Sequence, residues 1–320
     1  MGERPAVKRA IILLNLGGPT TMAEVKPFLF SLFYDPAIIT LPNPFRWILA
    51  QFITRARYHE AAHIYETLGG KSPLLEETQK QATALSARLD SHSQVFIAMR
   101  HATPRTDVAF HAARAWGAEE VVLLPLYPQF STTTTGSAIK AWKTLENQYH
   151  WHPKTRIVSS YPTIPGFIDP LAAEIQKLYE QAKTFGKPKV ILSAHGLPEK
   201  VIQAGDPYQS QVEATAQAIL QKLGIPAVEV TLSYQSRVGP LPWLKPYTNT
   251  VLREAAQNKR PIIMVPISFV SEHSETLYEL DKMYGHLARE NGSPAYFRVP
   301  TVSCDSAFIQ GLYQLIQVAN

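Results

Sequence analysis

Residues 189–198 read KVILSAHGLP, an apolar run that ends in a histidine and a sharp turn. A short β-branched run of this kind, bounded by Gly, Pro or polar residues, predicts a buried β-strand. Gly196 and Pro198 force the chain to turn directly after the run, so we expect His195 at the mouth of the strand. This segment and its repeats along the chain decide the fold class.

This run is one of eight of the same type, which are separated by segments of helical length. The first half contains Ala10–Leu16, Gln94–Met99, Glu120–Leu126 and Thr155–Tyr161, and the second half contains Lys189–Ala194, Val228–Ser233, Ile262–Ile267 and Tyr296–Val299. Near-continuous apolar strands that alternate with helices favour parallel sheets covered on both faces. We therefore predict an α/β protein with two similar doubly wound domains, each built on a four-stranded parallel sheet flanked by helices.

The length of 320 residues suits about two domains. Pro and Gly concentrate in SYPTIPGFIDP at 160–170, which predicts the boundary between them. The predicted domains are 1–161 and 162–305, the second carrying the metal site, and a last helix at 306–320 is expected to pack on the first. The halves echo one another in LNLGGP (14–19) and LSAHGLP (192–198), which indicates a structural duplication.

Composition excludes several classes of protein. With 45% hydrophobic and 18% charged residues, the chain is globular rather than disordered. A net charge of +5 without long runs of like charge does not demand nucleic acid, and we expect none as a partner. Cys304 is the only cysteine, so neither a disulfide nor a four-cysteine iron–sulfur cluster can form within the chain. A cytoplasmic location fits this, and the start MGERPAVKRA has no export signal.

The segment 28–54 is apolar and aromatic, but Asp35, Arg46 and three prolines interrupt it. Its uninterrupted apolar stretches are therefore too short to span a bilayer, although the segment could rest on one. It could also form an aromatic lip for a flat apolar ligand, or simply pack in the core. We carry peripheral contact with the inner face of the cell membrane forward as an expectation.

Candidate chemistry gathers where two strands of the second half end. Ligands of open parallel sheets bind beyond the carboxyl ends of the strands. His195 lies there, and Glu272, His273 and Glu275 follow the strand at 262–267. If the two strands are neighbours, an imidazole and several carboxylates converge on one cavity. Such a ligand set without a thiolate suits Fe²⁺, Mn²⁺ or Zn²⁺ held with open positions.

A helix that begins near Ser271 would give these carboxylates a common face. Four charged residues, Glu272, Glu275, Glu279 and Lys282, fall at i, i+3, i+7 and i+10 of this helix. The alternative interpretation is an ordinary solvated stripe. His273 would point away from Glu275 on a regular α-helix, so both can face one ligand only if the first turn is irregular or π-widened.

Other motifs suggest different chemistry. The segment His59–His63 matches H-E-x-x-H, the zinc motif of many metalloproteases, although its pattern predicts a surface helix. The loop Ser131–Gly136 (STTTTG) offers hydroxyls for an anion, or is simply solvated. Arg100, after the second strand, could hold a carboxylate or form a structural salt bridge.

Taken together, the motifs resemble the ferrochelatases, which insert Fe²⁺ into a porphyrin in haem biosynthesis. The resemblance runs from about Ile11 to Leu315 through LLNLGGP (13–19), GGKSPL (69–74), LPLYPQFSTTTTG (124–136), LSAHGLP (192–198), GDPY (205–208), YQSRVGPLPWLKP (234–246) and FVSEHSETLYELD (269–281). It implies two Rossmann-like domains of chelatase type with the porphyrin cleft between them.

The resemblance also implies roles for particular residues. His195 and Glu275 would be catalytic and, with His273, would bind the metal, while Glu272 and Glu279 would form an acidic path on a π-helical element. Porphyrin binding falls to Arg100, near the propionates, to Trp243 and Phe269 as cleft walls, and to Leu16, Tyr127 and Ser131. Thr132 stands where cluster-containing members have a cysteine, so the resemblance is to bacterial, cluster-free members.

The function implied is a lyase that inserts Fe²⁺, as substrate, into protoporphyrin IX to give protohaem with loss of two protons. The sequence leaves open a coproporphyrin III ferrochelatase, a chelatase for another tetrapyrrole or metal, a noncatalytic porphyrin-binding protein and an H-E-x-x-H zinc protease.

Overall fold

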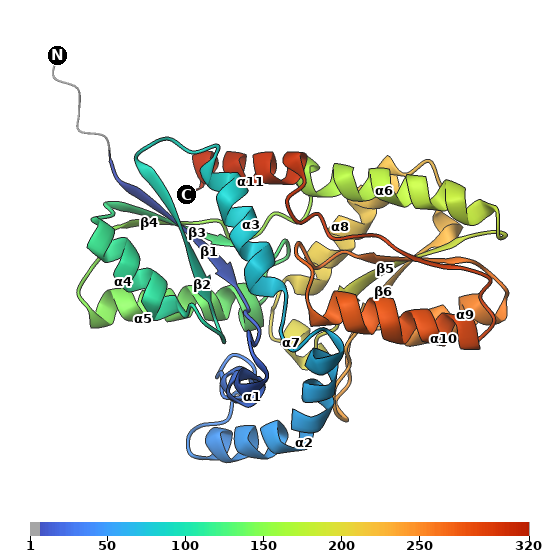
Figure 1. Cartoon of the computed structure of the whole chain (residues 1–320), viewed down its shortest axis with the longest axis horizontal. Helices are drawn as coiled ribbons and strands as arrows, with labels where there is room; N and C mark the ends of the chain where they lie inside the picture. The colour runs from blue at the N-terminus through green and yellow to red at the C-terminus, as the bar shows by residue number, and fades with distance from the viewer. Residues whose placement is uncertain (1–6, 320) are drawn as a thin grey trace. The chain divides into compact units, whose positions relative to one another are not determined.

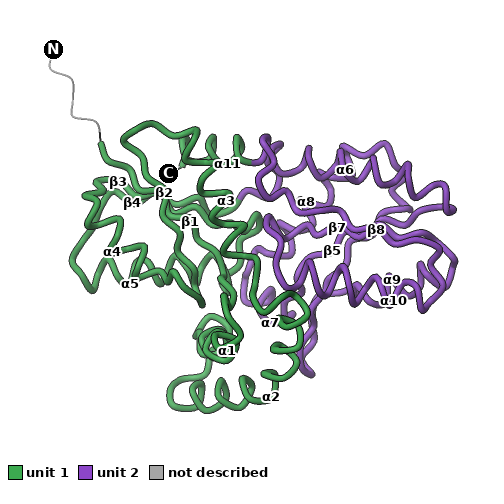
Figure 2. Tube along the Cα trace, viewed as in Figure 1, with its two compact units in different colours: residues 1–160, 309–320 green, residues 161–308 purple. Residues whose placement is uncertain are grey.

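The computed structural model describes residues 7–319. Three predictions fall partly outside the described residues. They concern the export signal at residues 1–10, the start of the first domain and the last residue of the C-terminal helix. The chain divides into two compact units (Figure 2), one formed up to residue 160 and again from 309, the other by residues 161–308. The sequence places its domain boundaries after residues 161 and 305.

Each unit contains a four-stranded, all-parallel sheet. The first sheet has the order β2-β1-β3-β4, with β1 (Arg9–Asn15), β2 (Ser93–Met99), β3 (Glu120–Pro125) and β4 (Lys154–Ile157). The second has the order β6-β5-β7-β8, with β5 (Lys189–His195), β6 (Val230–Gln235), β7 (Ile262–Pro266) and β8 (Tyr296–Arg298). The two orders are the same when strands are counted within each unit, so the predicted fold class is confirmed and the duplication is visible in the topology.

One predicted strand is clearly too long. The run Thr155–Tyr161 forms a strand only to Ile157, which pairs with Leu123 as the last residue pair between β4 and β3. Val158 adds a single backbone hydrogen bond to the carbonyl of Leu123, at 3.0 Å. The predicted run therefore extends four residues beyond the last residue of β4 that pairs with β3.

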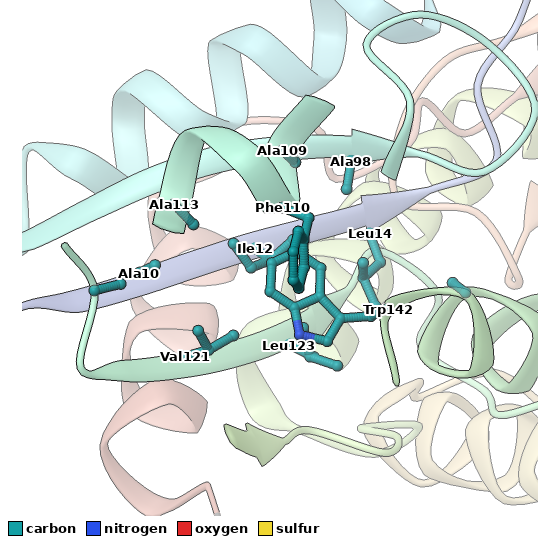
Figure 3. Packing of buried hydrophobic residues seen from close by; sticks show 12 residues of the cluster. Ala10, Ile12, Leu14, Ala98, Ala109, Phe110, Ala113, Val121, Leu123 and Trp142 are labelled. Atoms are coloured by element: carbon teal, nitrogen blue, oxygen red, sulfur yellow. The ribbon is translucent and has the colours of Figure 1, made fainter. Parts of the chain in front are cut away.

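The first unit has helices on both faces of its sheet (Figure 1). Its helices are α1 (Val25–Phe33), α2 (Phe45–Thr67), α3 (Leu74–Ser86), α4 (Thr106–Trp116) and α5 (Ser137–Gln148), with the short helices η1 (Met22–Glu24) and η2 (Thr132–Gly136), the latter a π-helix. Alternate residues of β1 and β3, among them Ile12 and Leu123, pack under α4 and α5. Figure 3 shows Phe110 and Trp142 filling this layer, with ring centroids 5.2 Å apart.

The second unit repeats the arrangement (Figure 1). Its helices are α6 (Pro165–Lys183), α7 (Glu199–Gln203), α8 (Tyr208–Lys222), α9 (Thr248–Gln257) and α10 (Tyr284–Glu290), with the short η3 (Ala227–Glu229) and the π-helix η4 (Glu275–Met283). One face of the sheet packs under α9, α10 and η4, and this layer buries Ile191, Met264 and Leu280 completely. The opposite face is covered by α6 and α8. The last helix, α11 (Ser306–Val318), belongs to the first unit from residue 309 on.

Among the helices within residues 7–319, none combines the length and the apolar character that crossing a membrane requires. The segment 28–54, in particular, is divided between α1 and α2 by an irregular stretch.

Candidate functional site

His195 is the last residue of β5, the strand that pairs with both β6 and β7. Both of its backbone groups are held, since its N–H donates to Ser268 Oγ at 2.9 Å and its carbonyl accepts from Tyr208 Oη at 2.9 Å. The next residue must be glycine for steric reasons, because a Cβ on Gly196 would lie 2.7 Å from the carbonyl oxygen of Gln235. The strand therefore presents a fixed imidazole at the carboxyl edge of the second sheet.

Glu275 faces this imidazole from the first residue of η4. Its Oε2 lies 2.8 Å from His195 Nδ1, and its Oε1 lies 3.8 Å from His273 Nε2. Burial alone would raise the pKa of Glu275, but the charges of His195 and His273 and the hydrogen bonds from His195 and Ser236 lower the pKa to about 2. Burial alone would lower the pKa of His195, but the charge and hydrogen bond of Glu275 raise it. The pair is therefore an imidazole matched to an ionised carboxylate.

A second carboxylate, Glu279, is joined to the first through Ser236. The Ser236 hydroxyl lies 2.9 Å from Glu275 Oε2 and 2.6 Å from Glu279 Oε2. On the other oxygen, Glu279 Oε1 accepts from the Ser236 N–H at 3.1 Å and from Tyr284 Oη at 3.0 Å. Burial, and then the charge of Glu275, raises the pKa of Glu279. The result is a continuous row, His195–Glu275–Ser236–Glu279.

The row leads to a cavity of about 530 Å³ within the second unit. Ser236, Glu279 and Tyr284 line it, together with the apolar side chains of Met283 and Leu287. This volume lies in the range of small-ligand sites. Glu279 therefore stands between the partly buried His195–Glu275 pair and a space that admits small molecules or ions.

The backbone of η4 is π-helical from Glu275 to Met283, and His273 lies in the irregular segment before it, so of the two expectations for the first turn the irregular one applies to His273. His273 precedes the helix, where its N–H donates to Thr276 Oγ1 at 3.0 Å. Its ring lies 4.5 Å from that of Phe269, and burial lowers its pKa. Within the described residues, His273 Nδ1 is buried without a hydrogen-bond partner.

Glu272 departs from the predicted stripe. The helix begins three residues later than the stripe assumes, so Glu272 lies before it and turns toward the edge strand β8. Its Oε1 lies 2.6 Å from Arg298 Nη1 and accepts from the Thr301 N–H at 2.9 Å. Burial would raise the pKa of Glu272, but the Arg298 charge lowers it. Three carboxylates therefore do not share one helical face, and only Glu275 and Glu279 stand in the row.

No group of three or more His, Cys, Asp or Glu side chains in residues 7–319 is arranged to hold a metal ion. The H-E-x-x-H residues His59 and His63 are exposed on α2 and belong to no such group. The described structure gives the zinc-protease interpretation no third ligand.

Several residues assigned to porphyrin binding lie at one edge of the first sheet. Leu16, Arg100 and Tyr127 follow β1, β2 and β3, three neighbouring parallel strands whose carboxyl ends share that edge. Ser131 is buried and caps η2, its Oγ accepting from the Thr133 N–H at 3.1 Å. The first hydroxyl of the STTTTG loop therefore has a capping role, which neither of the sequence-based alternatives for this loop included.

Arg100 is engaged in a buried cluster. Its Nη2 lies 2.8 Å from Asp35 Oδ2, and its Nε donates to Ser137 Oγ at 2.8 Å. The Arg100 side chain keeps 21% of its surface exposed, whereas Asp35 is buried. The salt bridge that the sequence left as an alternative is therefore present, and part of the Arg100 side chain remains accessible.

In the second unit, Trp243 and Phe269 are half-buried beside the histidines. Trp243 bridges to Pro198, and its Cε3 would lie 3.2 Å from a Cβ on Gly196. Phe269 contacts His273, as described above. Both aromatic side chains therefore border the turn and the loop that carry the two imidazoles.

The sequence did not single out Ser236, Tyr284 or Arg298. Ser236 follows the end of β6, at the same sheet edge as His195, so the strand-end rule that identified His195 could also have found it. Tyr284 and Arg298 give no comparable signal, because their partners come from other elements.

Comparison with known proteins gives one consistent family. The sequence profile of the ferrochelatase family matches residues 8–319. A curated protein named ferrochelatase from Wolbachia sp. subsp. Drosophila simulans (strain wRi) is 46% identical over 313 residues, which cover 97% of this chain and 98% of that protein. A ferrochelatase from Caulobacter vibrioides (strain NA1000 / CB15N) is 47% identical over 315 residues, 97% of this chain and 90% of the relative.

Among solved structures, SirB from Bacillus subtilis with Fe³⁺ matches with a TM-score of 0.57 at 13% identity, covering 97% of this chain and 95% of that one. At this identity the similarity concerns the chelatase fold alone.

Proposed function

This chain belongs to the ferrochelatase family, and from that premise we propose that it inserts Fe²⁺ into protoporphyrin IX to give protohaem. The protein is a lyase, and iron is its substrate. The observation that carries the proposal is the family match over residues 8–319 together with the His195–Glu275 contact of 2.8 Å at the carboxyl edge of the second sheet. The reaction releases two pyrrole protons for each Fe²⁺ that enters the macrocycle.

The second unit is proposed to supply the metal and proton chemistry. The Nδ1 atom of His195 is hydrogen-bonded to Glu275, so Nε2 is the nitrogen that accepts a pyrrole proton or first contacts the ion. Glu275 would complete a transient ligand set, with His273 next to it at 3.8 Å. Glu279 would carry protons or metal between this pair and the cavity that it lines. Glu272, held by Arg298, would act in the acidic path only through its charge.

Porphyrin contacts are proposed in each unit separately. In the first unit, the exposed part of Arg100 would attract a propionate, and Leu16, Tyr127 and Ser131 would contact the macrocycle. In the second unit, Trp243 and Phe269 would pack on its apolar surface. With one cysteine in the chain, its own residues cannot build a four-cysteine iron–sulfur cluster, and we propose that none is used.

An anaerobic absorbance titration tests the activity. Protein, protoporphyrin IX and Fe²⁺ or Zn²⁺ should give the metalloporphyrin spectrum with multiple turnovers. Parallel reactions with coproporphyrin III, and with Co²⁺ and sirohydrochlorin, compare kcat/KM for the rival substrates. A higher kcat/KM for either rival would reassign the substrate, and porphyrin binding without any metal insertion would indicate a noncatalytic binding protein.

We further propose that a cytoplasmic form of the protein rests on an anionic membrane through α2. Five large apolar side chains between 41 and 52 are exposed: Leu41, Phe45, Trp47, Ile48 and Phe52, the last at 69%. Exposed Arg55 lies on the same helix. Aromatic and basic side chains on one helix are typical of interfacial contact with anionic lipid.

Vesicle flotation tests this contact. The protein should float with vesicles containing an anionic lipid and less with purely zwitterionic ones, and Trp47→Ser with Phe52→Ser should reduce flotation. Val108→Ser, a change at another exposed apolar site, serves as the control. Equal flotation of the double variant and the parent would exclude α2 as the contact.

A further inference from the structure

The hydroxyl of Ser236 is the short link between two carboxylates. It lies 2.9 Å from Glu275 Oε2 and 2.6 Å from Glu279 Oε2. The amide of the preceding residue, Gln235, reaches the same two oxygens only at 3.4 and 3.5 Å. Hydrogen bonds weaken with such lengthening, so Ser236 is the principal group between Glu275 and Glu279.

One hydroxyl carries one hydrogen and can donate it fully to one acceptor. The contacts to Glu275 and Glu279 therefore form a linked pair rather than two independent donations. When the hydroxyl donates to Glu275, the 2.6 Å contact is strongest if Glu279 Oε2 carries a hydrogen and donates it to Ser236 Oγ. The opposite oxygen, Glu279 Oε1, already accepts from two donors, which leaves Oε2 as the oxygen for that hydrogen.

The backbone of Ser236 is also unusual. Its φ is 61°, a left-handed conformation that L residues other than Gly, Asn and Asp rarely adopt. This conformation follows the end of β6 and accompanies the donation of the Ser236 N–H to Glu279 Oε1 at 3.1 Å. A strained residue of this kind persists only where its surroundings hold it, and such residues cluster at functional sites.

We propose that Ser236 is a positioning residue for metal insertion, which fixes the separation and relative orientation of Glu275 and Glu279 through its hydroxyl and its backbone N–H. The inference rests on the proposed function, since it assigns Ser236 a part in the same site. Ser236 acts through the carboxylates and leaves the pyrrole nitrogens to His195. Groups that orient metal-contacting side chains in this way typically change metal affinity or activity by about 10- to 100-fold when removed.

Two substitutions separate the hydroxyl from the backbone. Ser236→Ala removes the hydroxyl and keeps a Cβ in the left-handed conformation, whereas Ser236→Gly removes the hydroxyl and relieves the strain. The control is Ser233→Ala, which removes a hydroxyl from β6, the strand that precedes Ser236. The Ser233 hydroxyl lies 2.9 Å from Thr248 Oγ1 and contacts no carboxylate. Kinetics with Fe²⁺ are measured at saturating porphyrin, and the porphyrin Kd is measured by fluorescence quenching.

The proposal expects both Ser236 variants to lose about 10- to 100-fold in kcat/KM for Fe²⁺, with a porphyrin Kd within twofold of the parent. Ser233→Ala should keep the parent kcat/KM. A Ser236→Gly variant as active as the parent would show that only backbone conformation matters and would overturn the proposal. Equal losses for Fe²⁺ and for porphyrin binding would also overturn it, because they indicate a general structural defect.

A separate measurement keeps this test distinct from the proposed function. Calorimetric titration with Zn²⁺ in the absence of porphyrin reports the metal site alone. Weaker Zn²⁺ binding by both Ser236 variants supports the positioning role even if the parent inserts no metal, and unchanged Zn²⁺ binding together with unchanged Fe²⁺ kinetics refutes it.

Discussion

Replacing Glu275 with Gln keeps the size of the side chain and removes its charge. The variant loses the charge-assisted hydrogen bond between Oε2 and His195 Nδ1, which is 2.8 Å long. A hydrogen bond to a charged group contributes about 1.5–3 kcal/mol. Because 36% of the His195 side chain and 26% of the Glu275 side chain are exposed, solvent screening favours the lower part of this range, about 1.5–2 kcal/mol.

That loss corresponds to a decrease of about 10- to 30-fold in kcat/KM for Fe²⁺, since 1.36 kcal/mol is a factor of ten. The pH profile should change as well. Burial lowers the pKa of His195 and Glu275 raises it, so Glu275→Gln leaves the lowering effect dominant. If neutral His195 is the active form, the acid limb of the kcat/KM profile moves to lower pH.

The assay is anaerobic formation of the metalloporphyrin, followed by absorbance between pH 5.5 and about 9, the range in which histidine titrates. Glu180→Gln is the matched control, because Glu180 forms an ion pair with Lys183 of the same 2.8 Å length on an exposed surface. A Glu275→Gln variant with kcat/KM within twofold of the parent and an unmoved acid limb would refute the reasoning.

His195→Ala should abolish metal insertion while porphyrin still quenches protein fluorescence, and unchanged turnover would remove His195 from the chemistry. Arg298→Ala leaves two carboxylate partners in a partly buried place and should lower the free energy of unfolding by about 3 kcal/mol, measured with denaturant. Because the pKa of Glu272 is lowered on folding, its contribution is complete above its ordinary pKa and is lost as the pH falls through the lowered one, so the stability gap between parent and Arg298→Ala should narrow in acid. Gly196→Ala brings a Cβ to 2.7 Å from the carbonyl oxygen of Gln235 and should cost about 1–3 kcal/mol, whereas a parent-like denaturation midpoint would contradict the crowding.

The strands and His195 could be predicted because their signals are local. An apolar β-branched run identifies a buried strand, and parallel topology brings the carboxyl ends of β5, β6 and β7 to one edge. The sequence left open whether the strands that precede His195 and Glu275 are neighbours; because β5 and β7 do pair, the rule brings the two side chains to the same edge. A departure from regular α-helix near Glu275 was also predictable, since His273 and Glu275 would point to different sides of a regular α-helix.

The remaining features depend on partners far along the chain. Glu272 leaves the predicted stripe because Arg298, 26 residues later on an edge strand, attracts it. Arg100 binds Asp35, which comes just after α1, so its carboxylate partner could not be chosen from the sequence. Ser236 was passed over because the predicted strand ends at residue 233, whereas β6 continues to Gln235.

The widened turns of η4 also limit how this gene segment can evolve. One residue added or removed between 279 and 283 would rotate every following side chain by about a quarter turn relative to Glu279, and Tyr284 would no longer reach Glu279. A length change here would therefore be far more damaging than a substitution. Across homologues, insertions and deletions should be absent from this stretch even at positions where the amino acid varies.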